Sequence, residues 1–207
     1  MSSRLVLVRH GQSRATVDGT VGGERGCRGL TATGHDQADA LAARLARTHE
    51  LAGADVLVSS TMPRAVETAA HLAPVLGLPV LQDRDLCELH PGEGDGLTWA
   101  EWERIYGSFD LGSEPDRPLS PGGESWAVFG VRARAALRTW AARGTTVVAV
   151  CHGGVIEQSL VLGFGLPGVT PPGHHLVTPP NTSLTEWRVT GGSWELVRYA
   201  DAAHLSE

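Results

Sequence analysis

Two histidines in this chain share one setting, in which each follows a short apolar run and precedes a glycine. The run Leu5–Val8 leads into Arg9-His10-Gly11, and the run Thr145–Cys151 leads into His152-Gly153-Gly154. Such runs are typical of buried strands, and open α/β sheets hold their ligands beyond the carboxyl ends of the strands. An imidazole can attack as a nucleophile, and a guanidinium binds oxyanions through charge-assisted hydrogen bonds. The pattern therefore predicts phosphoryl chemistry that needs no metal ion.

Hydrolysis of a phosphate monoester requires one of the largest enzymatic rate enhancements, up to ~10²¹-fold. A nucleophile divides the reaction into two displacements, fixed cations stabilise the charged phosphoryl oxygens, and an acid protonates the departing alkoxide. All 17 basic side chains are arginines, since the sequence contains no lysine. Every fixed side-chain cation at a phosphate site must therefore be an arginine, which rules out a P-loop lysine and a Schiff base.

Apolar periodicity divides the chain into alternating strands and helices, which predicts a three-layer α/β/α sandwich around a mainly parallel sheet. Thr61 is expected to cap the second helix, with Gly77 just beyond its end. Gly191-Gly192 predicts a hairpin between the last two strands. We expect strands at 5–8, 55–58, 79–81, 145–151, 183–189 and 194–199, and helices from 30, from 61, at 125–142 and at 153–162.

The segment 89–121 interrupts this alternation, because it is rich in glycine, proline and aspartate. We expect it to form a small crossover insertion with one short helix over the site, inside a single domain that spans 1–207. Trp99, Trp102 and Tyr106 within it stand at helical spacing, which favours core packing over a wall for substrate.

The composition argues against several classes of function. A net charge of −6 disfavours nucleic-acid binding, which needs a basic face. No apolar run approaches the ~20 residues that span a bilayer, and no signal-peptide pattern precedes the first strand, so we expect a cytoplasmic protein without a membrane partner. Cys27, Cys87 and Cys151 lack the spacing of zinc or redox sites, and we expect buried thiols.

Motifs distributed over most of the chain resemble, in the same order, those of the histidine phosphatase superfamily, which includes the cofactor-dependent phosphoglycerate mutases. A lone R-H-G tripeptide is a weak signal, but the ordered set is specific. The motifs are LVLVRHGQS at 5–13, LTATG with QA at 30–38, SSTMPRA with TA at 59–69, LCEL at 86–89, PGGES at 121–125, VCHGG at 150–154 and NTS at 181–183.

The resemblance implies a role for each matching residue. His10 is expected to be the nucleophile that forms a phosphohistidine, with its other ring nitrogen donating to a backbone carbonyl so that the attacking nitrogen is unprotonated. Arg9, Arg64 and His152 are expected to bind the phosphoryl oxygens. Glu88 is expected to be the general acid and then the general base. No metal ion or cofactor is implied.

Other polar residues leave alternatives open. Glu93 and Asp95 are rivals of Glu88 for the acid role. The pair His174-His175 lies in a proline-rich stretch, where adjacent rings rarely reach one ion, so a solvated or supporting role is favoured over metal ligation.

Small residues near the histidines could also contact the phosphate. The amides of Gly11 and Gly153 are expected to approach it closely, because glycine has no Cβ. Ser13 is a further candidate for binding, although Ser13 and Ser60 are both typical of turns or helix caps.

Departures from the family pattern reduce the number of family activities that this chain is expected to have. Thr16 stands where several members carry an asparagine, and Gly22–Arg28 lacks the F-T-G-W element of the mutases. Ser13 and Ala15 replace the arginine and proline of the phytase-like branch. We therefore expect a metal-independent hydrolase of a small phosphorylated metabolite. The alternatives are a phosphomutase with the same intermediate, a catalytically weak phospho-ligand-binding protein and a metallohydrolase. The sequence leaves open whether the chain forms a homodimer, since the hairpin near its end could pack against the core of the same chain or against a second copy.

Overall fold

Four parallel strands form most of the central sheet, and an antiparallel hairpin extends one edge. The computed structural model describes residues 2–166 and 178–205. The strand order is β3-β2-β4-β1-β5-β6, with β5 antiparallel to both β1 and β6. The strands are β1 (Ser2–Arg9), β2 (Val56–Ser59), β3 (Val80–Gln82), β4 (Thr146–Cys151), β5 (Leu184–Thr190) and β6 (Ser193–Asp201). The expected mainly parallel α/β sheet is confirmed.

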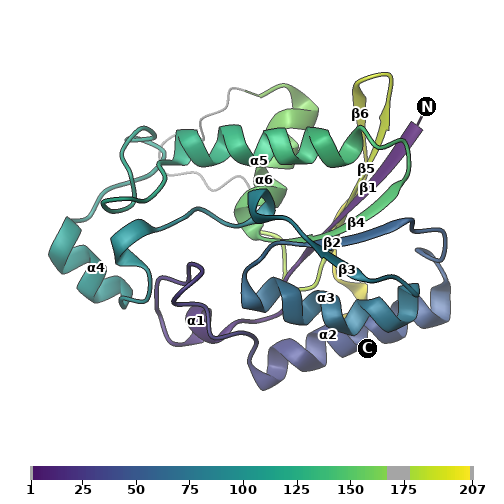
Figure 1. The fold of residues 1–207 in the computed structure, drawn as a ribbon, viewed down its shortest axis with the longest axis horizontal. Coiled ribbons are helices and arrows are strands. Elements are labelled where there is room, and N and C mark those ends of the chain that lie inside the picture. Colours follow the sequence, from purple (N-terminus) through teal and green to yellow (C-terminus); the bar gives the residue numbers. More distant parts are fainter. Residues whose placement is uncertain (1, 167–177, 206–207) are drawn as a thin grey trace.

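Helices cover both faces of this sheet. Figure 1 shows α5 and α6 on one face and α2 and α3 on the other. The α-helices are α1 (Arg14–Val17), α2 (Ala32–Thr48), α3 (Pro63–Leu76), α4 (Trp99–Tyr106), α5 (Trp126–Ala141) and α6 (Gly153–Phe164), and short 3₁₀ turns occur at Arg84–Leu86, Gly92–Gly94 and Ala203–Leu205. Within the described residues, no helix is both long and apolar enough to cross a membrane.

The alternating side chains of β1 supply both layers of the core. Leu5 and Leu7 pack in the cluster that holds Phe129 of α5, whereas Val6 and Val8 pack with side chains of α2 and α3. Successive side chains of a strand point to opposite faces, so a continuous apolar run is what a sheet covered on both faces requires. The strand is therefore fully buried just before it delivers Arg9 and His10 to its carboxyl end.

The start of α3 differs from the expectation that Thr61 caps it. Pro63 is the first residue of the helix, so the cap residue is Met62. The Met62 side chain makes no cap hydrogen bond. The Thr61 hydroxyl instead donates to the Glu24 carboxylate at 3.1 Å. Gly77 ends the helix with a φ of +66°, as expected.

The turn between β5 and β6 is built by Gly191 and Gly192. Both have positive φ, 58° and 87°, which the two-residue turn of a hairpin requires. The antiparallel pairing of the two strands confirms the expected hairpin.

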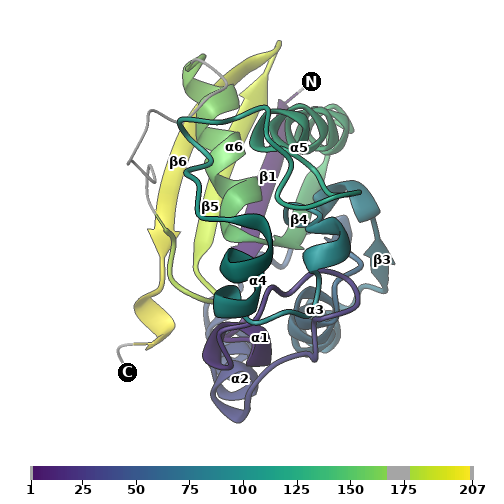
Figure 2. The ribbon, with the colours of Figure 1, turned by 90° about the vertical axis from the view of Figure 1, so that its left-hand side faces the viewer.

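The insertion 89–121 lies at the end of the molecule where β1 ends. In Figure 2, which looks at this end, α4 lies next to α1. The Trp99 amide donates to the Gly19 carbonyl at 3.0 Å and so ties the insertion to the loop after α1. Trp102 is buried and its Nε1 donates to the Leu119 carbonyl at 3.0 Å, which confirms core packing for this residue. Trp99 is 49% exposed, so the same expectation is wrong for Trp99.

Candidate active site

The register of neighbouring strands brings the two histidines together. Arg9 of β1 lies opposite Cys151 of β4, so the next residues, His10 and His152, are adjacent at the carboxyl edge of the sheet. Their ring centroids are 5.1 Å apart. Ser60 follows β2 on the other side of β4 and donates its amide to that strand. Three parallel strands thus place three polar side chains at one point.

His10 is held as a neutral imidazole with an available lone pair. Its Nδ1 lies 2.6 Å from the Gly11 carbonyl oxygen, and because a carbonyl can only accept, Nδ1 must carry the hydrogen. The unprotonated Nε2 accepts from Nε of Arg64 at 3.1 Å. Burial, reinforced by the charge of Arg64, lowers the pKa of His10 well below its ordinary value of 6.5. The expected backbone-carbonyl contact that selects the tautomer is confirmed.

Arg64 connects both histidines through one N–H group. Its Nε donates to Nε2 of His10 at 3.1 Å and to Nδ1 of His152 at 3.3 Å. Its Nη1 donates to the Gly22 carbonyl at 2.7 Å, and the residue is only 6% exposed. A phosphoryl group carried on Nε2 of His10 would therefore lie within reach of this guanidinium.

His152 has a hydroxyl partner that the sequence did not reveal. Its Nδ1 accepts from Arg64, so Nε2 of the neutral ring carries the hydrogen and donates to Ser60 Oγ at 2.7 Å. Burial, followed by the charge of Arg64, lowers the pKa of His152 well below 6.5. A hydroxyl can also donate. If Ser60 donates to Nε2, the neutral His152 carries its hydrogen on Nδ1 and can donate it to a phosphoryl oxygen.

Glu88 lines the same pocket as His10 and Arg64. Its Oε2 accepts from the Gly154 amide in the first turn of α6 at 2.9 Å, and its Oε1 accepts from the Leu89 amide at 3.3 Å. These bonds fix the carboxylate at the pocket wall, which Arg9, His10 and Arg64 also line. The geometry suits a group that exchanges a proton with a leaving or attacking oxygen.

The two rivals of Glu88 are placed elsewhere. The Asp95 carboxylate accepts from the amides of Gly23, Arg25 and Gly26 at 2.8, 2.8 and 2.9 Å. Glu93 is exposed and does not line the pocket. Asp95 therefore shapes the loop whose Gly22 carbonyl holds Arg64, a positioning task that sequence reasoning missed.

Arg9, Ser13 and Gly153 all line the pocket. Arg9 donates from Nη1 to the Pro179 carbonyl, and its buried Nε has no hydrogen-bond partner among the described residues. Burial lowers the pKa of Arg9. Ser13 is the buried cap of α1 and accepts from the Thr16 amide at 3.3 Å, so it acts as a cap while facing the pocket. Gly153 is the first residue of α6, where helix amides face an anion favourably.

Gly11 requires a correction. Its amide donates to the Thr68 hydroxyl at 3.0 Å, and Gly11 does not line the pocket. A Cβ at this position would lie 2.5 Å from the Gly34 carbonyl oxygen. The glycine is therefore needed for close packing against α2, not for approach of its amide to phosphate.

The remaining candidates for chemistry are Cys151 as a nucleophile and the possible metal ligands. Cys151 is fully buried and burial raises the pKa of its thiol, which agrees with a packing role. Among residues 2–166 and 178–205, no group of three or more histidine, cysteine or acidic side chains is arranged to hold a metal ion. His174 and His175 lie outside the described residues.

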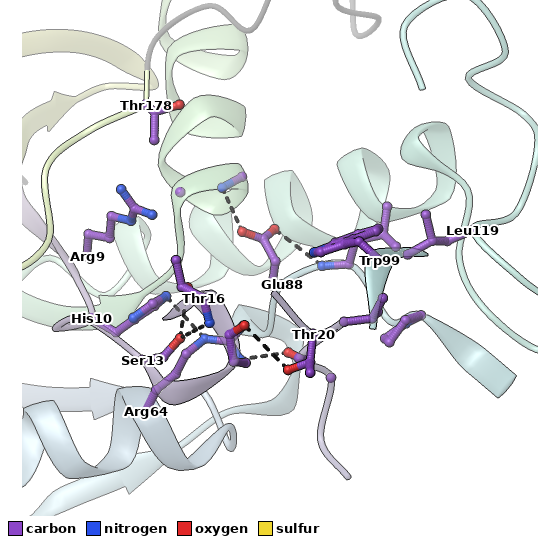
Figure 3. A pocket seen from close by; sticks show the side chains of 18 of the residues that line it. Arg9, His10, Ser13, Thr16, Thr20, Arg64, Glu88, Trp99, Leu119 and Thr178 are labelled. Carbon is purple, nitrogen blue, oxygen red and sulfur yellow. Dashed lines mark hydrogen bonds between the residues drawn. The ribbon is translucent and has the colours of Figure 1, made fainter. Parts of the chain in front are cut away.

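Arg9, His10, Arg64 and Glu88 line one cavity of about 430 Å³, whereas His152 is fully buried and does not line it. Figure 3 shows Arg9, His10 and Arg64 on one side, Trp99 and Leu119 on the other, and Glu88 between them. A phosphoryl group on the cationic side would thus leave its ester oxygen on the side of Glu88.

Comparison with known proteins agrees with this architecture. The family model described as histidine phosphatase superfamily (branch 1) matches residues 5–202. The chain is 32% identical over 213 residues to phosphoglycerate mutase-like protein 4 of Arabidopsis thaliana, covering 99% of this chain and 88% of that protein. It is 33% identical over 174 residues to a glucosyl-3-phosphoglycerate phosphatase of Mycolicibacterium vanbaalenii, covering 79% and 75%. The solved structure of a mycobacterial glucosyl-3-phosphoglycerate phosphatase with VO₃ superposes with a TM-score of 0.75 at 30% identity, covering 95% and 98%.

Proposed function

The chain belongs to the histidine phosphatase superfamily, and on this basis we propose that it hydrolyses a small phosphomonoester through a phosphohistidine on His10. The observation that carries the proposal is the state of His10. Its Nδ1 is bonded to the Gly11 carbonyl and its unprotonated Nε2 lies 3.1 Å from Arg64. This is the arrangement of a nucleophile beside the cation that stabilises its product.

The first step forms a P–N bond and breaks the P–O ester bond. Nε2 of His10 attacks phosphorus, and Arg9 and Arg64 hold the phosphoryl oxygens. His152 donates to one of these oxygens in its other neutral tautomer, in which the single ring hydrogen lies on Nδ1, Nε2 accepts from the Ser60 hydroxyl, and Nε of Arg64 donates to the phosphoryl group instead of to the ring. Glu88 gives its proton to the departing alkoxide, which leaves as the alcohol. Positive charge on the phosphorylated ring is balanced by the phosphoryl dianion, and Nδ1–H stays on the Gly11 carbonyl.

The second step returns the enzyme to its starting state. The carboxylate of Glu88 removes a proton from water, the oxygen attacks phosphorus, and the P–N bond breaks to restore neutral His10. Inorganic phosphate leaves, and Glu88 again carries the proton. Similarity to two glucosyl-3-phosphoglycerate phosphatases supports transfer to water over transfer to a second hydroxyl.

Turnover of p-nitrophenyl phosphate in EDTA tests the proposal. We expect the wild-type protein to release p-nitrophenolate and inorganic phosphate in equal amounts, and His10→Ala to be inactive. His49→Ala is the control, because His49 is exposed at the end of α2. Full activity of His10→Ala would overturn the mechanism, as would loss of activity in EDTA. Transfer of the phosphoryl group between hydroxyls of phosphoglycerate, without phosphate release, would identify a mutase.

A further inference from the structure

The pocket changes character with distance from the histidines. Among its described lining residues, the cationic side chains are Arg9 and Arg64, and both belong to the phosphate-binding side. The opposite wall is mainly apolar and is lined by Leu89, Trp99, Leu111, Leu119 and Trp126. Figure 3 shows this separation for Trp99 and Leu119. The cationic side therefore favours the phosphate of a ligand, and the apolar wall favours an apolar part of the same ligand.

Trp99 is a large aromatic side chain held at the pocket without being buried. It is the first residue of α4, whose start is fixed by a reciprocal cap between Thr98 and Glu101. Its ring meets buried Trp102 edge to face, with centroids 5.8 Å apart. The residue nevertheless stays 49% exposed. An exposed indole in a fixed position offers apolar area to a ligand at little entropic cost.

The apolar wall would not stabilise a second anionic group on the substrate. Apart from the two arginines, the charged residues that the structure describes at the pocket are the carboxylates of Glu88 and Glu157. A carboxylate or second phosphate placed against the apolar wall would lose hydration without gaining a cation from the described lining residues. The phosphate monoester of an uncharged alcohol has no such conflict, because its single dianion would lie against Arg9 and Arg64.

We propose that the substrate is the phosphate monoester of an uncharged alcohol with an apolar or aromatic body. This inference rests on the proposed hydrolase activity and adds the substrate class to it. The cavity of about 430 Å³ is near the small end of ligand pockets and holds a compact body of this kind. The same wall disfavours the bisphosphorylated compounds that prime a mutase.

The test compares substrates whose leaving groups are all alkoxides, so that each makes a similar demand on the general acid. Benzyl phosphate carries an aromatic body, glycerol phosphate an uncharged polar one, and 3-phosphoglycerate a second anion. We expect kcat/KM for benzyl phosphate to exceed that for 3-phosphoglycerate by at least about tenfold. Trp99→Ala should lower the benzyl phosphate value about tenfold and change the glycerol phosphate value by less than about twofold.

Ile105→Ala is a matched control, because Ile105 lies on the same helix, is 48% exposed and does not line the pocket. We expect this variant to behave as wild type. Trp99→Arg should raise kcat/KM for 3-phosphoglycerate, because it places a cation on the apolar wall.

Two sets of results are distinguishable. Equal or better hydrolysis of 3-phosphoglycerate, or equal losses in Trp99→Ala and Ile105→Ala, would overturn the substrate class and leave the hydrolase intact. Absence of phosphate release from every ester, or release that survives His10→Ala, would overturn the hydrolase itself.

Discussion

Acidification from pH 7.5 to 5.5 is expected to destabilise this fold through its two site histidines. His10 and His152 are 5% and 0% exposed, and burial, together with the charge of Arg64, holds the pKa of each well below 6.5. In the unfolded chain each imidazole takes up a proton near pH 6.5. The unfolded state then binds more protons than the folded state, so the free energy of unfolding decreases as the pH falls through that value.

The magnitude follows from proton linkage. A histidine that stays neutral in the fold loses about 1.4 kcal/mol of relative stability between pH 7.5 and 5.5, so the pair accounts for about 2.7 kcal/mol. His90, which is half-buried, has a lowered pKa and adds to the loss in every variant. The carboxylates with lowered pKa, such as Asp201, lose their stabilising effect at lower pH, outside this interval.

Urea unfolding followed by tryptophan fluorescence at pH 7.5, 6.5 and 5.5 measures this loss. His10→Asn and His152→Asn should each reduce the loss by about 1.4 kcal/mol relative to wild type. His49→Asn, at an exposed site, should lose as much as wild type. A wild-type free energy that does not change over this interval, or site variants that lose as much as wild type, would mean that the buried imidazoles take up protons as readily as those of the unfolded chain. Burial would then not keep His10 neutral.

Three further substitutions test other parts of the site. Glu88→Gln should slow hydrolysis of alkyl phosphates by about 10²–10⁴-fold, but with p-nitrophenyl phosphate, whose leaving group needs no proton, stopped-flow absorbance should show a burst of one p-nitrophenolate per chain. A slow reaction without a burst would contradict its role as the base in the second step. Asp95→Ala frees three loop amides, and calorimetry should show a Tm lower by about 4–8 °C together with a raised KM; an unchanged Tm would refute the loop-fixing role. Ser60→Ala should lower kcat/KM about tenfold, and Ser60→Thr should recover most of it, because the hydroxyl fixes the ring of His152. Equal losses in the two Ser60 variants would exclude the hydroxyl as the cause.

The chemistry could be predicted because it depends on local patterns. His10 and His152 each end an apolar strand, and parallel strands bring their carboxyl ends to one edge of a sheet. The neutral tautomer of His10 also followed, since a nucleophilic imidazole needs a partner for its second nitrogen. The first argument uses only the residue types and their order along the chain, whereas the second also uses the resemblance to the histidine phosphatase superfamily, which implies that His10 is the nucleophile.

The supporting contacts could not be predicted, because their partners are distant in sequence. The hydrogen bonds from the loop at 23–26 to the Asp95 carboxylate join segments about 70 residues apart in the sequence. The Ser60–His152 hydrogen bond joins residues 92 apart. Trp99 and Trp102 share helical spacing, but Trp102 is buried and Trp99 is not, because contacts that form only on folding, such as the bond from Trp102 to the Leu119 carbonyl, involve Trp102. The glycine at position 11 was assigned to phosphate for the same reason, since Gly34 is its neighbour only after folding.

Direct detection of phosphoryl-His10 tests whether the reaction proceeds through a covalent intermediate. Glu88→Gln is mixed with p-nitrophenyl phosphate, quenched with base, in which phosphohistidine survives, and analysed by intact mass and peptide mapping. We expect one phosphoryl group per chain, located on His10, lost on brief acid treatment and absent from the double variant with His10→Ala. A phosphoryl group on another residue, or none at any time during turnover, would contradict a mechanism that proceeds through His10.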